Sequence, residues 1–133
     1  MRKRLGPYAH FGIIDDFDKT EDYSDLRYVF GQTYKEYIRR HHCLAVPDEI
    51  INDWWDGLLE MKSYVRSFDR PETAVDRWGV TLIPPESIDV FIKIIITRTS
   101  AEWIKKCGEI LFALLSLLEK AKEENKFVIH YGV

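Results

Sequence analysis

The sequence predicts a single α-rich α+β domain, built as a bundle of about four helices with a small two- or three-stranded sheet. The chain has 133 residues, of which 46% are hydrophobic and 14% aromatic, and this suits one packed core. Two long stretches carry apolar residues at helical spacing, and shorter apolar segments around them have the length and composition of strands.

The first part of the chain predicts a strand and then a helix. Tyr8–Ile14 is short and apolar, as is typical of a strand or an extended arm. The acidic run that follows predicts a solvated turn with one buried Phe. It does not fit a calcium loop, because the required Gly and closing Glu are not at their positions. Ser24 is placed to cap a helix that continues to Ile38.

The two long stretches each predict an amphipathic helix. The first opens at Pro47 and continues to Phe68, with apolar residues every three or four positions: Ile51, Trp54, Leu58, Met61, Val65 and Phe68. The second covers Ser100 to Asn125 and repeats this spacing in Trp103, Cys107, Ile110, Leu114, Leu117 and Ala121. Because the two stripes match, we expect these helices to pack side by side.

Two strands and one further helix are expected around the second stretch. Trp78–Ile83 is bounded by prolines and predicts a strand, which could pair with a final strand at Lys126–Tyr131 and with Tyr8–Ile14. The run Val90–Ile96 suits a strand by its β-branching, but the Pro-Pro-Glu opening and a charge pair at i, i+4 favour a helix buried on most sides.

We make specific predictions for the N-cap of the last helix and for two residues within it, Gly108 and Phe112. Thr99 or Ser100 should cap it. Gly108 lies off the apolar stripe and costs about 1 kcal/mol relative to alanine, so we expect another backbone to approach it closely. Phe112 is either buried under the N-terminal arm or part of a contact patch.

The net charge of −3 conceals segregated blocks. Residues 15–25 and 47–61 each carry −5, whereas residues 1–14 and 26–46 each carry +3. The acidic blocks disfavour a nucleic-acid partner, whose best surface would be Arg2–Arg4 with Lys35, Arg39 and Arg40. No apolar run is long enough to cross a membrane. The start is basic without an apolar run behind it, so we expect no signal peptide and a cytoplasmic location.

No motif for catalysis, cofactor binding or metal binding was found, so we expect no enzyme and no cofactor. The sequence has no Gly-rich phosphate loop, no HExxH and no Gly-x-Ser-x-Gly. The best catalytic candidate is the charged connector from Asp69 to Trp78, which a surface ion-pair network explains better. His41, His42 and Cys43 could suggest a metal site, but helix capping explains them better. Cys43 and Cys107 are expected to be buried thiols.

A binding function therefore remains, with two alternatives. An acidic face edged with an aromatic side chain suits a basic protein partner, because charge steers the encounter and an aromatic anchor holds the complex. The candidate residues for such a face are Asp15, Asp16, Asp18, Glu49, Asp53, Asp56 and Trp55. Alternatively, Phe112 and Leu115 on the back of the last helix form a homodimer in a structural or assembly protein.

In its size, its acidity and its lack of catalytic motifs, the chain resembles the small bacterial immunity proteins that neutralise a toxic nuclease or pore-former. The stretch from Trp78 to Ser87 also looks like one found in short uncharacterised bacterial proteins. The resemblance implies tight one-to-one binding of a cognate toxin in the cytoplasm.

Overall fold

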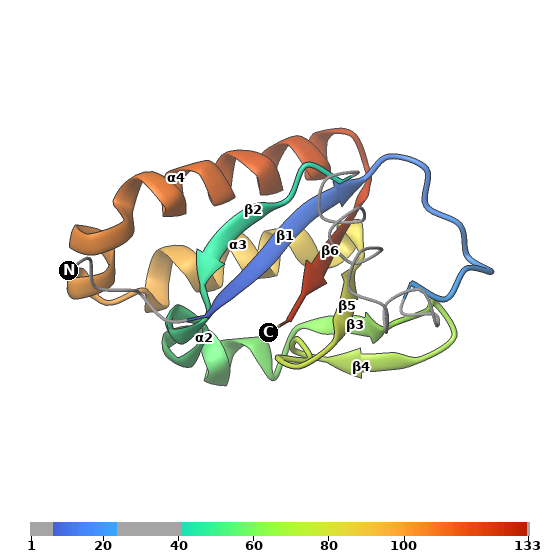
Figure 1. The fold of residues 1–133 in the computed structure, drawn as a ribbon, viewed down its shortest axis with the longest axis horizontal. Helices are drawn as coiled ribbons and strands as arrows, with labels where there is room; N and C mark the ends of the chain where they lie inside the picture. Colours follow the sequence, from blue (N-terminus) through green and yellow to red (C-terminus); the bar gives the residue numbers. More distant parts are fainter. Residues whose placement is uncertain (1–6, 24–40, 133) are drawn as a thin grey trace.

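The computed structural model describes residues 7–23 and 41–132, and a six-stranded antiparallel sheet is its central element (Figure 1). The strands lie in the order β2-β1-β6-β5-β3-β4. Their bounds are Tyr8–Ile14 (β1), Leu44–Pro47 (β2), Lys62–Val65 (β3), Pro71–Thr73 (β4), Val80–Ile83 (β5) and Phe127–Tyr131 (β6). The helices are the short 3-10 helix η2 (Asp48–Ile50), α2 (Ile51–Leu58), α3 (Pro85–Arg98) and α4 (Ala101–Glu123).

The prediction of a helical bundle with a small sheet is therefore wrong. The described residues form an α+β fold in which a full antiparallel sheet carries the helices. The central strands were found in the sequence: β1 has the predicted bounds, and β6 pairs with both β1 and β5. The edge strands β2 and β4 were missed, and the helix expected from Ser24 lies outside the described residues.

The largest local error concerns the helix predicted from Pro47 to Phe68. Its helical part ends at Leu58, and the chain then turns into strand β3, which pairs with β4 and β5. The side chains that were assigned to one helical stripe therefore lie partly on helix α2 and partly on or after strand β3. The extensive helix contacts are those of α2 with α3 and of α3 with α4, so the expected side-by-side packing of the two stripes is also wrong.

The helices cover one face of the sheet and make the larger core (Figure 1). Alternate residues of the strands, among them Phe11, Ile83 and Val128, point into it and meet Phe91, Leu114 and Leu118 of α3 and α4. The intervening residues face the other side, where Ile14, Tyr23, Tyr64, Val80, Leu82, Ile129 and Tyr131 form a second buried cluster. Both faces of the central strands are thus buried, which explains their nearly continuous apolar sequence.

The two helices after β5 begin where the sequence places them, but α4 is not one regular helix, because its backbone is kinked at Cys107 (φ −132°, ψ 26°). α3 begins at Pro85, so the helical interpretation of Val90–Ile96 is confirmed, but Ile96 is 63% exposed and only one side of the helix is buried. The Ser100 hydroxyl caps α4 by accepting a hydrogen bond from the Trp103 N–H. No described helix combines the length and the apolar content that crossing a membrane requires.

The structure also tests the sequence expectations about the two cysteines and about Phe112. Cys43 and Cys107 are both free thiols; Cys107 is buried and Cys43 is half-buried. Burial raises the pKa of Cys43 to about 12. Phe112 is 72% exposed, so the expectation that it is buried under the N-terminal arm is wrong.

Candidate functional site

Trp78 is the most exposed aromatic side chain in the described part of the chain, with 80% of its surface accessible. It lies on a turn that leads into β5, and the turn is fixed by hydrogen bonds around Asp76. The Asp76 carboxylate accepts from the Trp78 N–H at 3.0 Å, and the Asp76 N–H donates to the Thr81 hydroxyl at 2.7 Å. The indole therefore projects into solvent from a well-fixed backbone.

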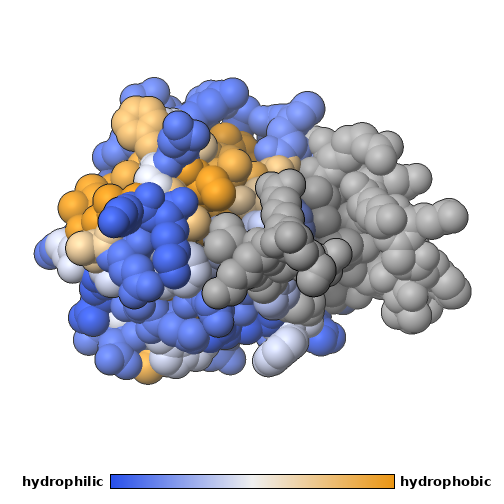
Figure 2. Space-filling view, turned by 60° about the vertical axis from the view of Figure 1, so that its left-hand side comes forward, coloured by the Kyte–Doolittle hydropathy of each residue, from blue (hydrophilic) through white to orange (hydrophobic). Residues whose placement is uncertain are grey.

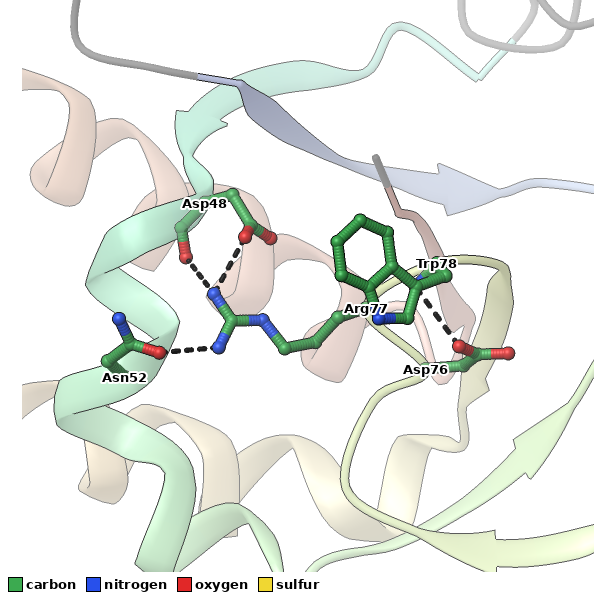
Figure 3. A network of polar contacts seen from close by, with 5 residues as sticks. All are labelled: Asp48, Asn52, Asp76, Arg77 and Trp78. Atoms are coloured by element: carbon green, nitrogen blue, oxygen red, sulfur yellow. Dashed lines mark hydrogen bonds and ion pairs between the residues drawn. The ribbon is translucent and has the colours of Figure 1, made fainter.

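Arg77 ties this turn to the beginning of α2. Its guanidinium donates to the Asp48 carboxylate at 2.7 Å and to the Asp48 carbonyl at 3.0 Å, and also to the side-chain oxygen of Asn52 (Figure 3). The Asp48 side chain is 11% exposed and that of Arg77 24%, so this ion pair is largely shielded from water. Such pairs are held more firmly than exposed ones.

The residue after β6 also contacts the turn that carries Trp78. The Gly132 N–H donates to the Gly79 carbonyl at 2.6 Å. A Cβ atom at Gly132 would collide with the backbone of Arg77, so the two backbones approach each other too closely for any side chain there. The turn is thus held by η2, α2, β5 and the chain after β6.

Carboxylates gather on the helical segment to which Arg77 is tied. Residues 48–60 contain five acidic side chains and no Lys or Arg: Asp48, Glu49, Asp53, Asp56 and Glu60. Glu49, Asp56 and Glu60 are exposed, whereas Asp48 is neutralised by Arg77. The Asp53 carboxylate accepts a hydrogen bond from the Ser100 N–H at 2.9 Å and so connects α2 to the beginning of α4.

The other acidic block lies at the opposite end of β1 (Figure 1). Tyr8, the first residue of β1, pairs with Pro47 beside η2, whereas the acidic turn follows the last residue. The two blocks are therefore separated by a seven-residue strand, or about 20 Å. The predicted partner-binding residues are not brought together into one surface.

In the acidic turn after β1, two of the three predicted carboxylates, Asp15 and Asp18, already accept hydrogen bonds from neighbouring residues. Asp15 accepts from the Lys126 ammonium at 2.8 Å, and this hydrogen bond lowers the pKa of Asp15. The same contact, with a second from Glu124, raises the pKa of Lys126 to about 12. Asp18 accepts from the N–H and the hydroxyl of Thr20, while Asp16 is exposed.

Trp55, the aromatic residue expected to border the acidic face, is half-buried and packs against the core. Trp54 beside it is fully buried and donates its indole N–H to the Thr99 hydroxyl at 2.9 Å. Sequence reasoning missed Trp78 as the exposed aromatic side chain because it assigned this residue to a strand. The signal was available, because Asp76 followed by Gly79 is an Asx-turn pattern.

The predicted catalytic connector does not form a reactive cluster. Asp69 accepts from the Ser67 hydroxyl at 2.5 Å, which lowers the pKa of Asp69, while Asp76 and Arg77 serve the turn described above. Among the described residues, no group of three or more His, Cys, Asp or Glu side chains is placed to hold a metal ion. A cavity of about 350 Å³ is lined by Ile13, Asp15, His41, His42, Ser116, Leu117 and Lys120.

No protein-family model, curated protein or solved structure matches this chain. Its function is therefore inferred from the geometry of its own side chains.

Proposed function

We propose that this chain is a protein-binding module that neutralises a basic partner, such as a toxin domain, by one-to-one contact with the surface formed by Trp78 and the acidic residues of η2 and α2. The observation that carries the proposal is the 80% exposure of Trp78 on a turn that is hydrogen-bonded to an acidic helix. We call this the Trp78 surface; it comprises Trp78, Glu49, Asn52 and Asp56.

The turn is already ordered, and this favours tight binding. A side chain that projects from a mobile loop loses conformational entropy when it is captured, whereas one on a fixed backbone loses less. The Arg77–Asp48 pair and the Asp76 hydrogen bonds hold the backbone of Trp78 in place before any partner arrives. Tryptophan is also among the residues most often found at the energetic centre of interfaces.

Charge indicates the class of partner. Glu49, Asp56 and Glu60 are exposed. Arg77 and Arg98, the latter beside Gly57, offset two of the five carboxylates of residues 48–60, so the charge around α2 is negative on balance. A basic protein would be steered toward this end of the molecule, and a nucleic acid would be repelled. The general resemblance to small immunity proteins agrees with this chemistry and suggests a toxic enzyme or pore-former as the partner.

The test is capture of the partner from the native lysate, followed by binding measurements with the isolated protein. Trp78→Ala should raise the Kd by about 30-fold, which is the effect of losing a hot spot of about 2 kcal/mol. Asp56→Lys should lower the association rate and reduce its dependence on salt. Asp56 is preferable to Asp53 for this purpose, because Asp53 also bonds to the Ser100 N–H.

Asp16→Lys is the matched control, because it changes the net charge equally at the other end of β1. It should leave the Kd nearly unchanged. Equal binding by the wild type and Trp78→Ala would contradict the proposal, and so would an equal effect of Asp16→Lys and Asp56→Lys.

A further inference from the structure

A cavity of about 350 Å³ lies between the end of β1, the turn at residues 41–42 and the part of α4 that follows its kink. It is called here the β1–α4 cavity. Its inner wall is formed by side chains that are buried or half-buried: Ile13, His41 and Leu117. Its opening is bordered by exposed polar side chains: Asp15, His42, Ser116 and Lys120. Cavities that combine a largely apolar wall with a few polar groups are the usual binding sites of small molecules.

The groove of about 200 Å³ between α3 and α4 is different in kind. Figure 2 shows hydrophobic side chains gathered on this side of the molecule. Phe112 and Leu115, the residues that the sequence suggested for self-association, line this groove. Thr99, a polar residue that lines it, is already hydrogen-bonded to Trp54 and to the Ile95 carbonyl. Among the described residues, the groove therefore offers no unpaired polar side chain that would select a ligand, and the homodimer stays a prediction.

Hydrogen-bond donors lie next to each other at the opening of the β1–α4 cavity. Ser116 and Lys120 are four residues apart on α4, beyond the kink at Cys107 and in a stretch of regular helical backbone, so they are on the same side of the helix. His42 borders the same opening from the turn before β2. None of these three side chains forms a hydrogen bond or an ion pair with another described residue. A hydroxyl, an ammonium and an imidazole are thus available to a ligand.

The carboxylate among the described residues that line this cavity is already paired. Asp15 accepts a hydrogen bond from the Lys126 ammonium at 2.8 Å. This hydrogen bond, with smaller contributions from the charges of Lys126 and Lys120, lowers the pKa of Asp15. Three other carboxylates of this region do not line the cavity: Glu119, Glu123 and Glu124. Lys120 therefore supplies a full positive charge at the opening that no described side chain contacts directly.

These groups suit a small carboxylate with an apolar body. Lys120 carries a single positive charge, which matches a monoanion, whereas the additional charge of a phosphate dianion would face Asp15. A charge-assisted hydrogen bond from the ammonium and one from the Ser116 hydroxyl would hold the carboxylate at the opening. The apolar body would pack against Ile13 and Leu117. A cavity of about 150 Å³ is large enough for benzene, so about 350 Å³ accommodates a group of that size together with its acid group.

We propose that the β1–α4 cavity binds a small organic carboxylate, with Lys120 and Ser116 holding the acid group and the inner wall contacting the apolar body. This ligand site is distinct from the Trp78 surface, which lies beside η2 at the other end of β1. Ligand binding and partner binding can therefore fail separately.

Benzoate is the probe, because benzamide and benzamidine have nearly the same shape but are neutral and positively charged, respectively. Binding to the full chain is measured by NMR titration at constant ionic strength. Benzoate should bind with a Kd below about 10 mM, as expected for a ligand of this size, and the largest shifts of backbone amide signals should come from residues that line the cavity. Benzamide should bind at least about tenfold more weakly, and benzamidine more weakly still, because neither offers a carboxylate to Lys120.

Removal of the ammonium tests the role of Lys120. Lys120→Gln should raise the benzoate Kd by about tenfold without lowering the Tm, because the side chain is exposed. Lys105→Gln is the matched control: it removes the same charge from another exposed position of α4 that does not line the cavity, and it should leave the Kd within about twofold of the wild type. Ser116→Ala should raise the Kd by about threefold, since it removes a neutral donor. Trp78→Ala should leave benzoate binding unchanged.

Three results would overturn the proposal. One is a benzoate titration that does not saturate or whose signal shifts lie outside the cavity. Another is benzamidine that binds as tightly as benzoate, which would exclude selection of an anion. The third is an equal effect of Lys120→Gln and Lys105→Gln, which would show that the net charge of the protein, and not the Lys120 side chain, accounts for the binding.

Discussion

His130 should make the protein progressively less stable as the pH falls from about 6.5, and His130→Leu should remove this dependence. His130 is the fourth of the five residues of β6, where it pairs with Phe11 on β1 and Thr81 on β5, and its side chain is fully buried. Its ring centroid is 5.0 Å from that of Phe11. Neither of its ring nitrogens has a hydrogen-bond partner among the described residues.

The magnitude follows from the pKa of His130. Burial, with smaller contributions from His10 and Arg77, lowers it from 6.5 to about 3. Above pH 6.5 the histidine is neutral in both the folded and the unfolded states, so it causes no pH dependence there. Between about 6.5 and 3 the unfolded chain binds a proton that the folded chain cannot accept, so the free energy of unfolding falls by about 1.4 kcal/mol per pH unit. Two units of acidification below 6.5 should therefore cost about 2.5 kcal/mol from this residue alone.

The assay is urea unfolding of the wild type and His130→Leu at a series of pH values between about 7.5 and 4.5. Other groups, including the half-buried His10, titrate in both proteins, so the difference between the two curves isolates His130. The wild type should lose stability relative to the variant as the pH falls. Ile129→Val is the control: it should lower stability by about 1 kcal/mol at every pH, because it removes volume but no titratable group. Parallel pH profiles for the wild type and His130→Leu would refute the reasoning.

Three further predictions concern packing. Gly132→Ala should destabilise the fold by about 2 kcal/mol, because its Cβ would meet the Arg77 backbone, whereas Gly108→Ala has open space around it and should stabilise the monomer by up to about 1 kcal/mol. Urea unfolding measures both changes, and a loss of stability in Gly108→Ala would contradict the second. Trp54→Ala should cost about 3–5 kcal/mol, because it empties a fully buried site and leaves Thr99 without its indole donor. Thermal unfolding detects this as a large fall in Tm, and a variant as stable as the wild type would show that Trp54 is not part of the core.

The elements that could be predicted are those whose signals are local. The Ser100 cap, the proline at the start of α3 and the apolar period of α4 all act within a few residues, and the structure has these helices where the sequence indicated them. The hydrophobic character of β1 and β6 also identified them as strands, because both of their faces are buried.

The error between Leu58 and Phe68 has a physical cause. Apolar residues spaced by three and four fit a helix, but Tyr64 and Val65 also have high strand propensity. The hydrogen bonds of β3 come from β4 and β5, which follow it in the chain, so its conformation depends on partners that no local pattern reveals. The edge strands β2 and β4 have four and three residues, too few to show an alternation.

The candidate site could be predicted only in part. The acidic character of residues 47–61 and the exposure of Glu49 and Asp56 follow from the sequence pattern. The choice between Trp54, Trp55 and Trp78 as the exposed indole does not, because it depends on which side of α2 meets α3 and on the turn that Arg77 and Asp48 hold.

The sequence alone thus determined the helices with clear caps, the central apolar strands, the free thiols and the two acidic blocks, because each depends on composition or on neighbours within one or two turns. Only the tertiary structure decided that a six-stranded sheet organises the chain, since strand pairing joins residues far apart in sequence. It also separated the acidic blocks to opposite ends of β1 and left Trp78 and Phe112 exposed. A side chain is exposed when no other part of the folded chain packs against it, so its exposure cannot be predicted from the residues beside it in the sequence.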